Sequence, residues 1–102
     1  MVGSSMEGME KYFSLHLHIS GFVQGVGFRF YTINSARAYG VTGWVKNLYD
    51  GRVEIEAEGT RKRLVPFLEE IRIGPRSAHV QGVAENWHEI AFPRYKSFTV
   101  GY

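Results

Sequence analysis

The sequence predicts an α+β fold in which two helices cover one face of an antiparallel sheet. Three observations lead to this fold class. Apolar and polar residues alternate before residue 20, two later segments have helical spacing, and the order along the chain is strand, helix, strand, strand, helix, strand. With 102 residues, 44% of them hydrophobic, the chain has enough apolar side chains for one domain around a single core.

The first two elements are a strand and a helix separated by a glycine-rich segment. A half-buried strand is predicted over residues 13–19, where four apolar side chains alternate with polar ones: Phe13, Leu15, Leu17 and Ile19. A helix is predicted over residues 28–39, where apolar side chains recur at helical spacing. Gly40 follows it, and glycine is the residue best suited to end a helix.

The next two strands form a predicted hairpin. Residues 41–47 and 52–58 have strand character, and they flank the dipeptide Asp50–Gly51. An Asp-Gly pair favours tight hairpin turns, because both positions tolerate the left-handed backbone that such turns require. These two strands are therefore expected to pair antiparallel.

The second helix is predicted to begin after Thr60, a suitable N-cap, and to end at Gly74–Pro75. Its apolar residues lie on one face: Leu64, Val65, Phe67, Leu68 and Ile71. Residues 78–92 and 97–102 supply two closing strands.

The complete order is that of a ferredoxin-like βαββαβ sandwich, with a possible extra edge strand at the C-terminal end. We expect the domain to span residues 11–102. Residues 1–10, rich in glycine, serine and glutamate, are expected to form a flexible N-terminal lead.

Composition limits the classes of function. A net charge of +2 is too small to require nucleic acid as a partner, and no apolar run is long enough to cross a membrane. The chain has no cysteine, which rules out disulfides, thiolate metal ligands and a cysteine nucleophile, and which fits a reducing cytoplasm. We therefore expect a cytoplasmic protein that binds neither nucleic acid nor membrane.

The most informative motif is the segment Gly21–Arg29, which joins the first strand to the first helix. Glycines allow main-chain N–H groups to approach a ligand closely, and a helix begins with unpaired N–H groups and a positive dipole end. Arg29 adds a guanidinium that can bind one oxyanion through two hydrogen bonds. The segment is therefore expected to bind a phosphate-sized anion.

Other phosphate-binding motifs do not fit this segment. A P-loop needs lysine followed by serine or threonine, and the dinucleotide motif needs a third glycine where Phe30 stands. Asp50 is the only aspartate in the chain, which argues against an aspartyl nucleophile or a carboxylate-held magnesium ion. With no covalent nucleophile and no metal site, hydrolysis would have to use water directly.

A second motif, Gly43–Asn47, ends with Asn47, whose side-chain amide has both an acceptor and donors. The two motifs together closely resemble the acylphosphatase family. The resemblance covers nearly all of the chain after about residue 11 and includes the following segments: Gly21–Arg29, Gly43–Asn47, Asp50–Gly51, Val53–Glu54, Gly74–Pro75, Ala78 and Val80.

The resemblance implies an enzyme that hydrolyses the carboxyl–phosphate bond of acyl phosphates to a carboxylate and inorganic phosphate. It implies that Asn47 orients the attacking water and that the phosphate binds to Arg29 and the loop amides: Val23, Gln24, Gly25, Val26, Gly27 and Phe28. A carboxylate leaves without protonation, so no general acid is needed. No cofactor or metal is implied, and we expect a monomer whose partners are an acyl phosphate and a phosphate-like anion.

Some residues depart from the usual family pattern. Phe22 stands where a basic residue is frequent, Lys46 stands where arginine is common, and Gly101–Tyr102 lacks a frequent basic residue. These differences affect the expected substrate preference more than the chemistry.

Two other functions are compatible with the predicted order of elements. One is a noncatalytic or accessory module that binds phosphate or carbamoyl phosphate, like the N-terminal part of hydrogenase maturation factors. The end of the chain at Tyr102 favours a free-standing enzyme instead. The other is an RNA-recognition module, but the outward face of the third strand carries Glu54, Glu56 and Glu58, which would repel a phosphate backbone.

His16 and His18 lie on the same face of the first strand. Two histidines without a third ligand nearby make a weak metal site. The first and third strands are neighbours in this fold, so ionic pairing of the histidines with Glu54 and Glu56 is the preferred interpretation.

Overall fold

The computed structural model describes residues 10–101. The lead predicted over residues 1–10 therefore lies, except for Glu10, outside the described residues, as does Tyr102. The elements, in chain order, are β1 (Tyr12–Phe22), α2 (Phe28–Tyr39), β2 (Thr42–Asn47), β3 (Val53–Thr60), α3 (Arg61–Ile73), β4 (His79–Ile90) and β5 (Phe98–Val100).

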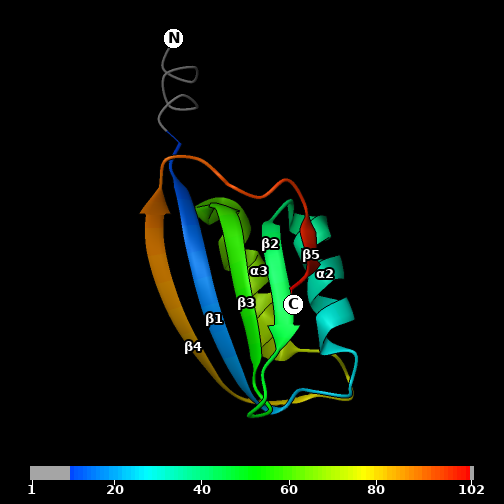
Figure 1. Ribbon diagram of the computed structural model, residues 1–102. Helices are drawn as coiled ribbons and strands as arrows, with labels where there is room; N and C mark the ends of the chain where they lie inside the picture. The colour runs from blue at the N-terminus through cyan, green and yellow to red at the C-terminus, as the bar shows by residue number, and fades with distance from the viewer. Residues whose placement is uncertain (1–9, 102) are drawn as a thin grey trace.

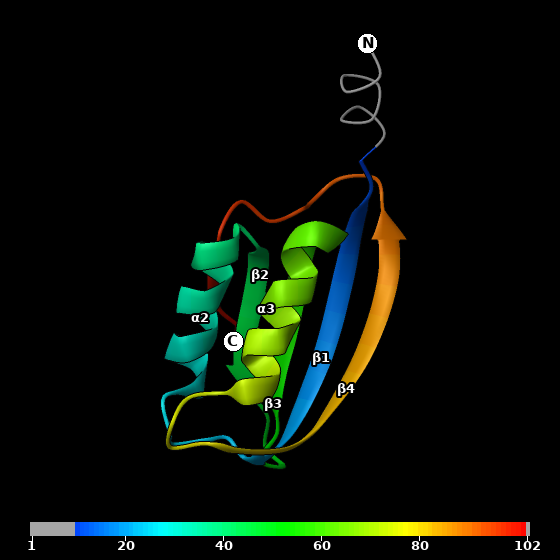
Figure 2. The same ribbon diagram turned by 180° about the vertical axis from the view of Figure 1, so that it is seen from behind.

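The strands form one sheet in the order β4–β1–β3–β2–β5. β1 pairs antiparallel with both β3 and β4, and β2 pairs antiparallel with β3. Both helices lie behind this sheet in Figure 1 and in front of it in Figure 2. The predicted ferredoxin-like sandwich is thus confirmed. The extra C-terminal strand β5 pairs parallel with β2, so the complete sheet is mixed.

The alternation that predicted the first strand stops before the strand ends. Its register against β4 shifts between Ser20 and Gly21, where a bulge interrupts the period of two, and β1 continues to Phe22. A Cβ on Gly21 would lie 2.2 Å from the main-chain oxygen of His79, so only glycine fits there. A pattern of period two cannot follow a strand through such a bulge.

The two helices match their predicted positions. α2 has the expected bounds and is followed by Gly40 with a left-handed φ of 71°. Thr60 occupies the N-cap of α3 in an extended conformation but makes no capping hydrogen bond through its side chain. Neither of the described helices is long and apolar enough to cross a membrane.

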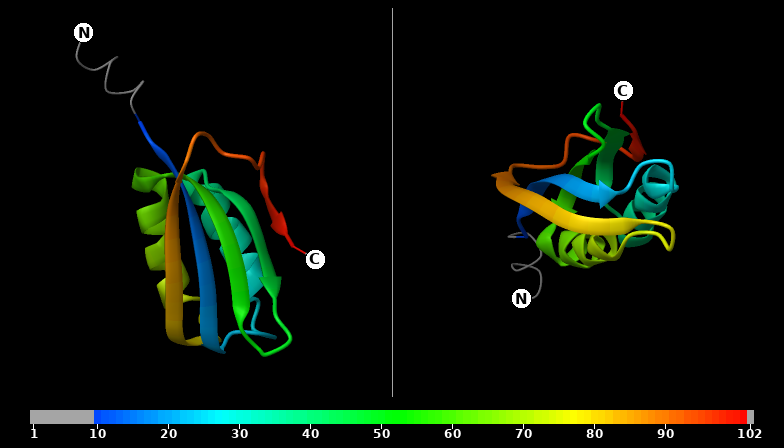
Figure 3. Two further views of the ribbon diagram at one scale, coloured as in Figure 1. Left: turned by 60° about the vertical axis from the view of Figure 1, so that its left-hand side comes forward. Right: turned by 90° about the horizontal axis from the view of Figure 1, so that it is seen from below.

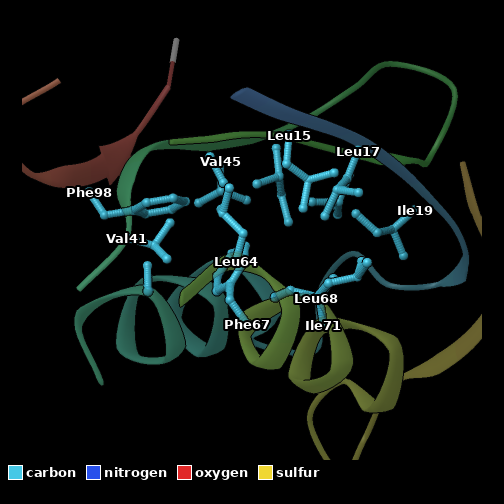
Figure 4. Packing of buried hydrophobic residues seen from close by; sticks show 14 of the residues in the cluster. Leu15, Leu17, Ile19, Val41, Val45, Leu64, Phe67, Leu68, Ile71 and Phe98 are labelled. Carbon is cyan, nitrogen blue, oxygen red and sulfur yellow. The ribbon is translucent and has the colours of Figure 1, made fainter. Parts of the chain in front are cut away.

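The core lies between the sheet and the two helices. Figure 4 shows apolar side chains of the sheet facing those of the helices. The strand side chains include Leu15, Leu17 and Ile19, and α3 contributes Leu64, Phe67, Leu68 and Ile71, all of them buried. Phe98 of β5 packs against Phe67, with 6.0 Å between the ring centroids. This core holds the glycine loop and the end of β2 on rigid elements.

The other face of the sheet carries polar side chains, and the predicted pairing across it is confirmed. His16 Nε2 lies 2.6 Å from Glu54 Oε2. The connection from β4 to β5 crosses one end of the sheet (Figure 3), and its Arg94 binds Glu58, which is fully buried. The expectation that all three outward glutamates would repel a phosphate backbone is therefore modified, because Arg94 covers the carboxylate of Glu58 and pairs with it.

The segments that carry the two sequence motifs meet at one end of the molecule. The glycine loop before α2 and the turn between β2 and β3 lie together at the lower end of Figure 1. The β4–β5 connection lies at the opposite end. Residues 18 or more positions apart in the sequence are thus brought to one site.

Candidate active site

The glycine loop enters α2 through two left-handed glycines. Gly25 has a φ of 73°, and Gly27, the N-cap of α2, has a φ of 78°. No side chain caps this helix, and its first turn carries no acidic residue. The positive end of the helix dipole is therefore not neutralised by a nearby carboxylate of that turn.

The loop leaves its main-chain donors available. Among the described residues, the N–H groups of residues 24–27 make no hydrogen bond to the main chain or to a side chain. A Cβ placed on Gly25 or Gly27 would meet no atom within 4 Å. Unpaired amides at a helix start, next to open space, are the arrangement that binds phosphate groups.

One pocket of about 370 Å³ brings the loop together with Arg29 and Asn47. It is lined by Val23, Gly25, Gly27, Phe28, Arg29, Phe30, Ile33, Asn47 and Val100. Arg29 is exposed on the first turn of α2 and makes no ion pair or hydrogen bond with the residues that the structure describes. Its guanidinium is therefore free to bind an anion in the pocket.

Asn47 is the last residue of β2 and lies on the side of the sheet that faces the helices. Alternation along the strand explains this position, because Gly43 and Val45 on the same side are buried. The side-chain oxygen Oδ1 of Asn47 is buried and has no hydrogen-bond partner among the described residues. A buried amide oxygen without a partner is costly, so a ligand or water that satisfies this amide would be bound favourably.

Gln24 has a role that the sequence did not indicate. Its side chain does not line the pocket with Arg29; Nε2 donates to the main-chain oxygens of Leu48 and Arg52, at 2.7 and 2.9 Å. The side chain thus ties the glycine loop to the β2–β3 hairpin that carries Asn47. No sequence pattern could have found this contact, because it depends on how the two loops meet in space.

The remaining predicted loop residues divide between the pocket and the core. Val23 is buried and Val26 packs against the core, so their side chains anchor the loop. Phe30, Ile33 and Val100 line the pocket although they were not predicted to. Ile33 lies one helical turn after Arg29 and Phe30, which is a signal that spacing alone could have supplied.

The chemistry of the lining is simple. The described residues that line this pocket include no aspartate, glutamate or histidine, and therefore no evident general acid or base. The groups available are main-chain amides, one guanidinium and one side-chain amide. A larger pocket of about 410 Å³ lies beside Trp44 and Tyr95, and its lining includes neither Arg29 nor Asn47 nor a residue of the glycine loop. Phe22, which is 63% exposed, lines neither pocket.

Comparisons with known proteins found relatives of similar sequence and similar structure. The family model described as acylphosphatase matches residues 15–100. An acylphosphatase from Archaeoglobus fulgidus is 47% identical over 89 residues, which cover 87% of this chain and 98% of that protein. The crystal structure of acylphosphatase from Bacillus subtilis matches with a TM-score of 0.84 and 33% identity, covering 88% of this chain and 99% of the other. HypF from T. kodakarensis matches with a TM-score of 0.74 and 30% identity, over 87% of this chain but 12% of HypF.

Proposed function

The chain belongs to the acylphosphatase family, and from this premise we propose that Arg29 and the glycine loop bind the substrate phosphate while Asn47 orients the attacking water. The enzyme hydrolyses the carboxyl–phosphate bond of acyl phosphates to a carboxylate and inorganic phosphate. The observation that carries the proposed residue roles is the single pocket lined by the loop, Arg29 and Asn47.

In the proposed mechanism the phosphoryl group lies over the first turn of α2. The amides of the loop and the guanidinium of Arg29 stabilise the negative charge that its oxygens carry in the transition state. In enzymes that stabilise a developing oxyanion in this way, removing one such donor lowers kcat by about 10²–10³-fold. Arg29 suits this role because its planar fork can hold two oxygens at once.

Asn47 positions the water molecule that acts as the nucleophile. Its amide can accept a hydrogen bond from a water and hold it in line with the bond that breaks. The water attacks phosphorus, the carboxylate leaves with the electrons of the phosphorus–oxygen bond, and the proton of the water is released. Because a carboxylate is a good leaving group, the absence of an acidic side chain from the pocket lining is compatible with turnover.

The test of the phosphate-binding role compares Arg29→Lys with Arg37→Lys, a matched change farther along the same helix. We expect Arg29→Lys to lower kcat/KM for benzoyl phosphate by about 10²–10³-fold and to weaken inhibition by inorganic phosphate. Arg37→Lys should match the wild type in both quantities. A folded Arg29→Lys variant with wild-type kcat/KM and phosphate inhibition would refute the role of Arg29.

We also propose the localisation, oligomeric state, metal independence and domain bounds of the enzyme. It acts as a cytoplasmic monomer without a metal cofactor, in one domain over residues 11–102. The lack of cysteine supports the cytoplasm, and the lack of carboxylate and histidine side chains in the described pocket lining supports a metal-free site. Cell fractionation, sedimentation equilibrium, limited proteolysis and assay with a chelator test these four points separately.

A further inference from the structure

A cluster of possible metal ligands lies on the face of the sheet that the helices do not cover. His16 and His18 alternate with the buried Leu15, Leu17 and Ile19, so both point away from the core. β3 lies directly beside β1 on this face (Figure 1), and Glu54 stands opposite His18 in the register. The sheet therefore supplies the third donor that the sequence did not place next to the two histidines.

The three side chains already converge. Their ligand atoms all lie within 4.8 Å of one another. His16 Nε2 is 2.6 Å from Glu54 Oε2, and His18 Nε2 is 3.7 Å from the same oxygen. The two histidine side chains are 35% and 32% exposed, so an ion can reach them from solvent.

From this geometry we propose that His16, His18 and Glu54 bind a divalent transition metal ion such as Zn²⁺. Two imidazoles and one carboxylate are a ligand set that suits zinc, with water in the fourth position. Bonds of about 2.0–2.1 Å place tetrahedral donors about 3.4 Å apart. The donor atoms here lie within 4.8 Å of one another, so rotation of these partly buried side chains reaches this spacing and the strands need not move.

The neighbours of the cluster fit such a site. Glu56 Oε1 lies 3.9 Å from Nδ1 of His16. Histidines that bind metals usually present their second ring nitrogen to a carboxylate, which fixes the ring. Glu56 is itself held by Ser14 and Arg94, so it is suited to orient His16 rather than to bind the ion.

One cation competes for the same carboxylate. Lys46 Nζ lies 3.7 Å from Oε1 of Glu54. The histidines face the other oxygen, Oε2. A metal bound through Oε2 therefore need not displace the lysine.

The proposed metal site is separate from the phosphate pocket. None of its three ligands lines that pocket, which is formed on the helix side of the sheet. Metal binding and acyl phosphate hydrolysis can consequently be measured independently, and the metal proposal does not require a metal in catalysis.

The test is titration of the untagged full-length chain with Zn²⁺ by isothermal titration calorimetry in a phosphate-free buffer. We expect one equivalent of Zn²⁺ to bind the wild type. His18→Gln and Glu54→Gln should each weaken this binding by at least about tenfold. His18→Gln is the cleaner variant, because it leaves the 2.6 Å contact between His16 and Glu54 in place.

The matched control is His79→Gln, which removes an exposed histidine at the start of β4. It should bind Zn²⁺ as the wild type does. Circular dichroism checks that each variant is folded, and His16→Gln replaces any variant that is not. The proposal fails if the wild type does not bind one equivalent, or if the folded ligand variants keep wild-type affinity.

Discussion

Gln24 donates a hydrogen bond from Nε2 to the main-chain oxygen of Leu48, with 2.7 Å between the two atoms. The residue before Leu48 is Asn47, and five residues after Gln24 comes Arg29. This one contact therefore links the segment that carries the arginine proposed to bind phosphate to the segment that carries the asparagine proposed to orient the water. Their relative position is fixed by a side chain that belongs to neither role.

Replacing Gln24 with methionine keeps the length of the side chain but removes its hydrogen bonds to Leu48 and Arg52. We expect kcat for benzoyl phosphate to fall by at least about tenfold, because small displacements of catalytic groups are costly. Inhibition by inorganic phosphate should change much less. Gln81→Met on the exposed surface of β4 is the control. An unchanged kcat in folded Gln24→Met would show that the contact does not position the site.

Alanine variants of Gly25 and Gly40 distinguish the effect of backbone strain on stability from the effect of a blocked pocket on activity. Their φ angles are 73° and 71°, at opposite ends of α2, so alanine at either position should cost about 1–2 kcal/mol of unfolding free energy. Of these two glycines, only Gly25 lines the pocket that contains Arg29 and Asn47. We expect Gly25→Ala alone to lower kcat/KM strongly. Urea unfolding and the benzoyl phosphate assay measure the two effects, and equal activity in both variants would contradict the proposed close approach of the anion.

Arg94 is predicted to hold the β4–β5 connection to the sheet. Its Nε lies 2.7 Å from Oε2 of the fully buried Glu58, and hydrogen bonding to this carboxylate raises the pKa of Arg94 above its usual value. Arg94→Met leaves a buried carboxylate without its cation and should lower the free energy of unfolding by about 2–3 kcal/mol. Arg76→Met, at an exposed turn, should change it by less than about 0.5 kcal/mol in urea unfolding. Equal stabilities would show that the ion pair contributes nothing.

Ionisation of Tyr31 is predicted to lower the free energy of unfolding at alkaline pH. Burial and the hydrogen bond to Glu70 raise the pKa of Tyr31 to about 12, above the value of about 10 in an unfolded chain. The folded state therefore holds the phenolic proton more tightly, so this stabilisation is complete below about pH 10 and is lost as the pH rises through about 12.

The measurement is urea unfolding between pH 9 and about 12. The wild type should lose free energy of unfolding more steeply in this range than Tyr31→Phe does. Tyr49→Phe, at a fully exposed position, should follow the wild type. The same slope in the wild type and Tyr31→Phe would refute the contribution of Tyr31.

Much of the fold could be predicted from the sequence because local patterns determine it. The alternation of β1, the helical spacing of α2 and the glycines at their ends each require only neighbouring residues. The bulge at Gly21 and the parallel pairing of β5 could not be predicted, because they depend on strands far apart in the chain. The burial of Glu58 could not be predicted for the same reason: its alternation indicates the open face, but Arg94, 36 positions away in the chain, covers it.

The candidate site was also predictable only in part, because some of its contacts depend on segments far apart in the chain. The pocket contains Arg29 and Asn47 together, as the two motifs led us to expect, although their catalytic roles stay predictions. The side-chain contacts of Gln24 and the position of Val100 could not be read from spacing, since each joins two segments through tertiary structure. The pairing of Glu54 with the histidines was predictable, because the expected fold places the first and third strands side by side, but the close approach of all three ligand atoms was not.

The most direct test of the account measures phosphate release from benzoyl phosphate with a chelator present, in the wild type, in Asn47→Ala and in the control Asn34→Ala. After correction for spontaneous hydrolysis, we expect the wild type and Asn34→Ala to turn over. Asn47→Ala should lose about 10²–10³-fold in kcat while inorganic phosphate still binds. Near-normal turnover in folded Asn47→Ala would contradict the water-orienting role, and phosphate binding without turnover in the wild type would indicate an anion-binding module instead.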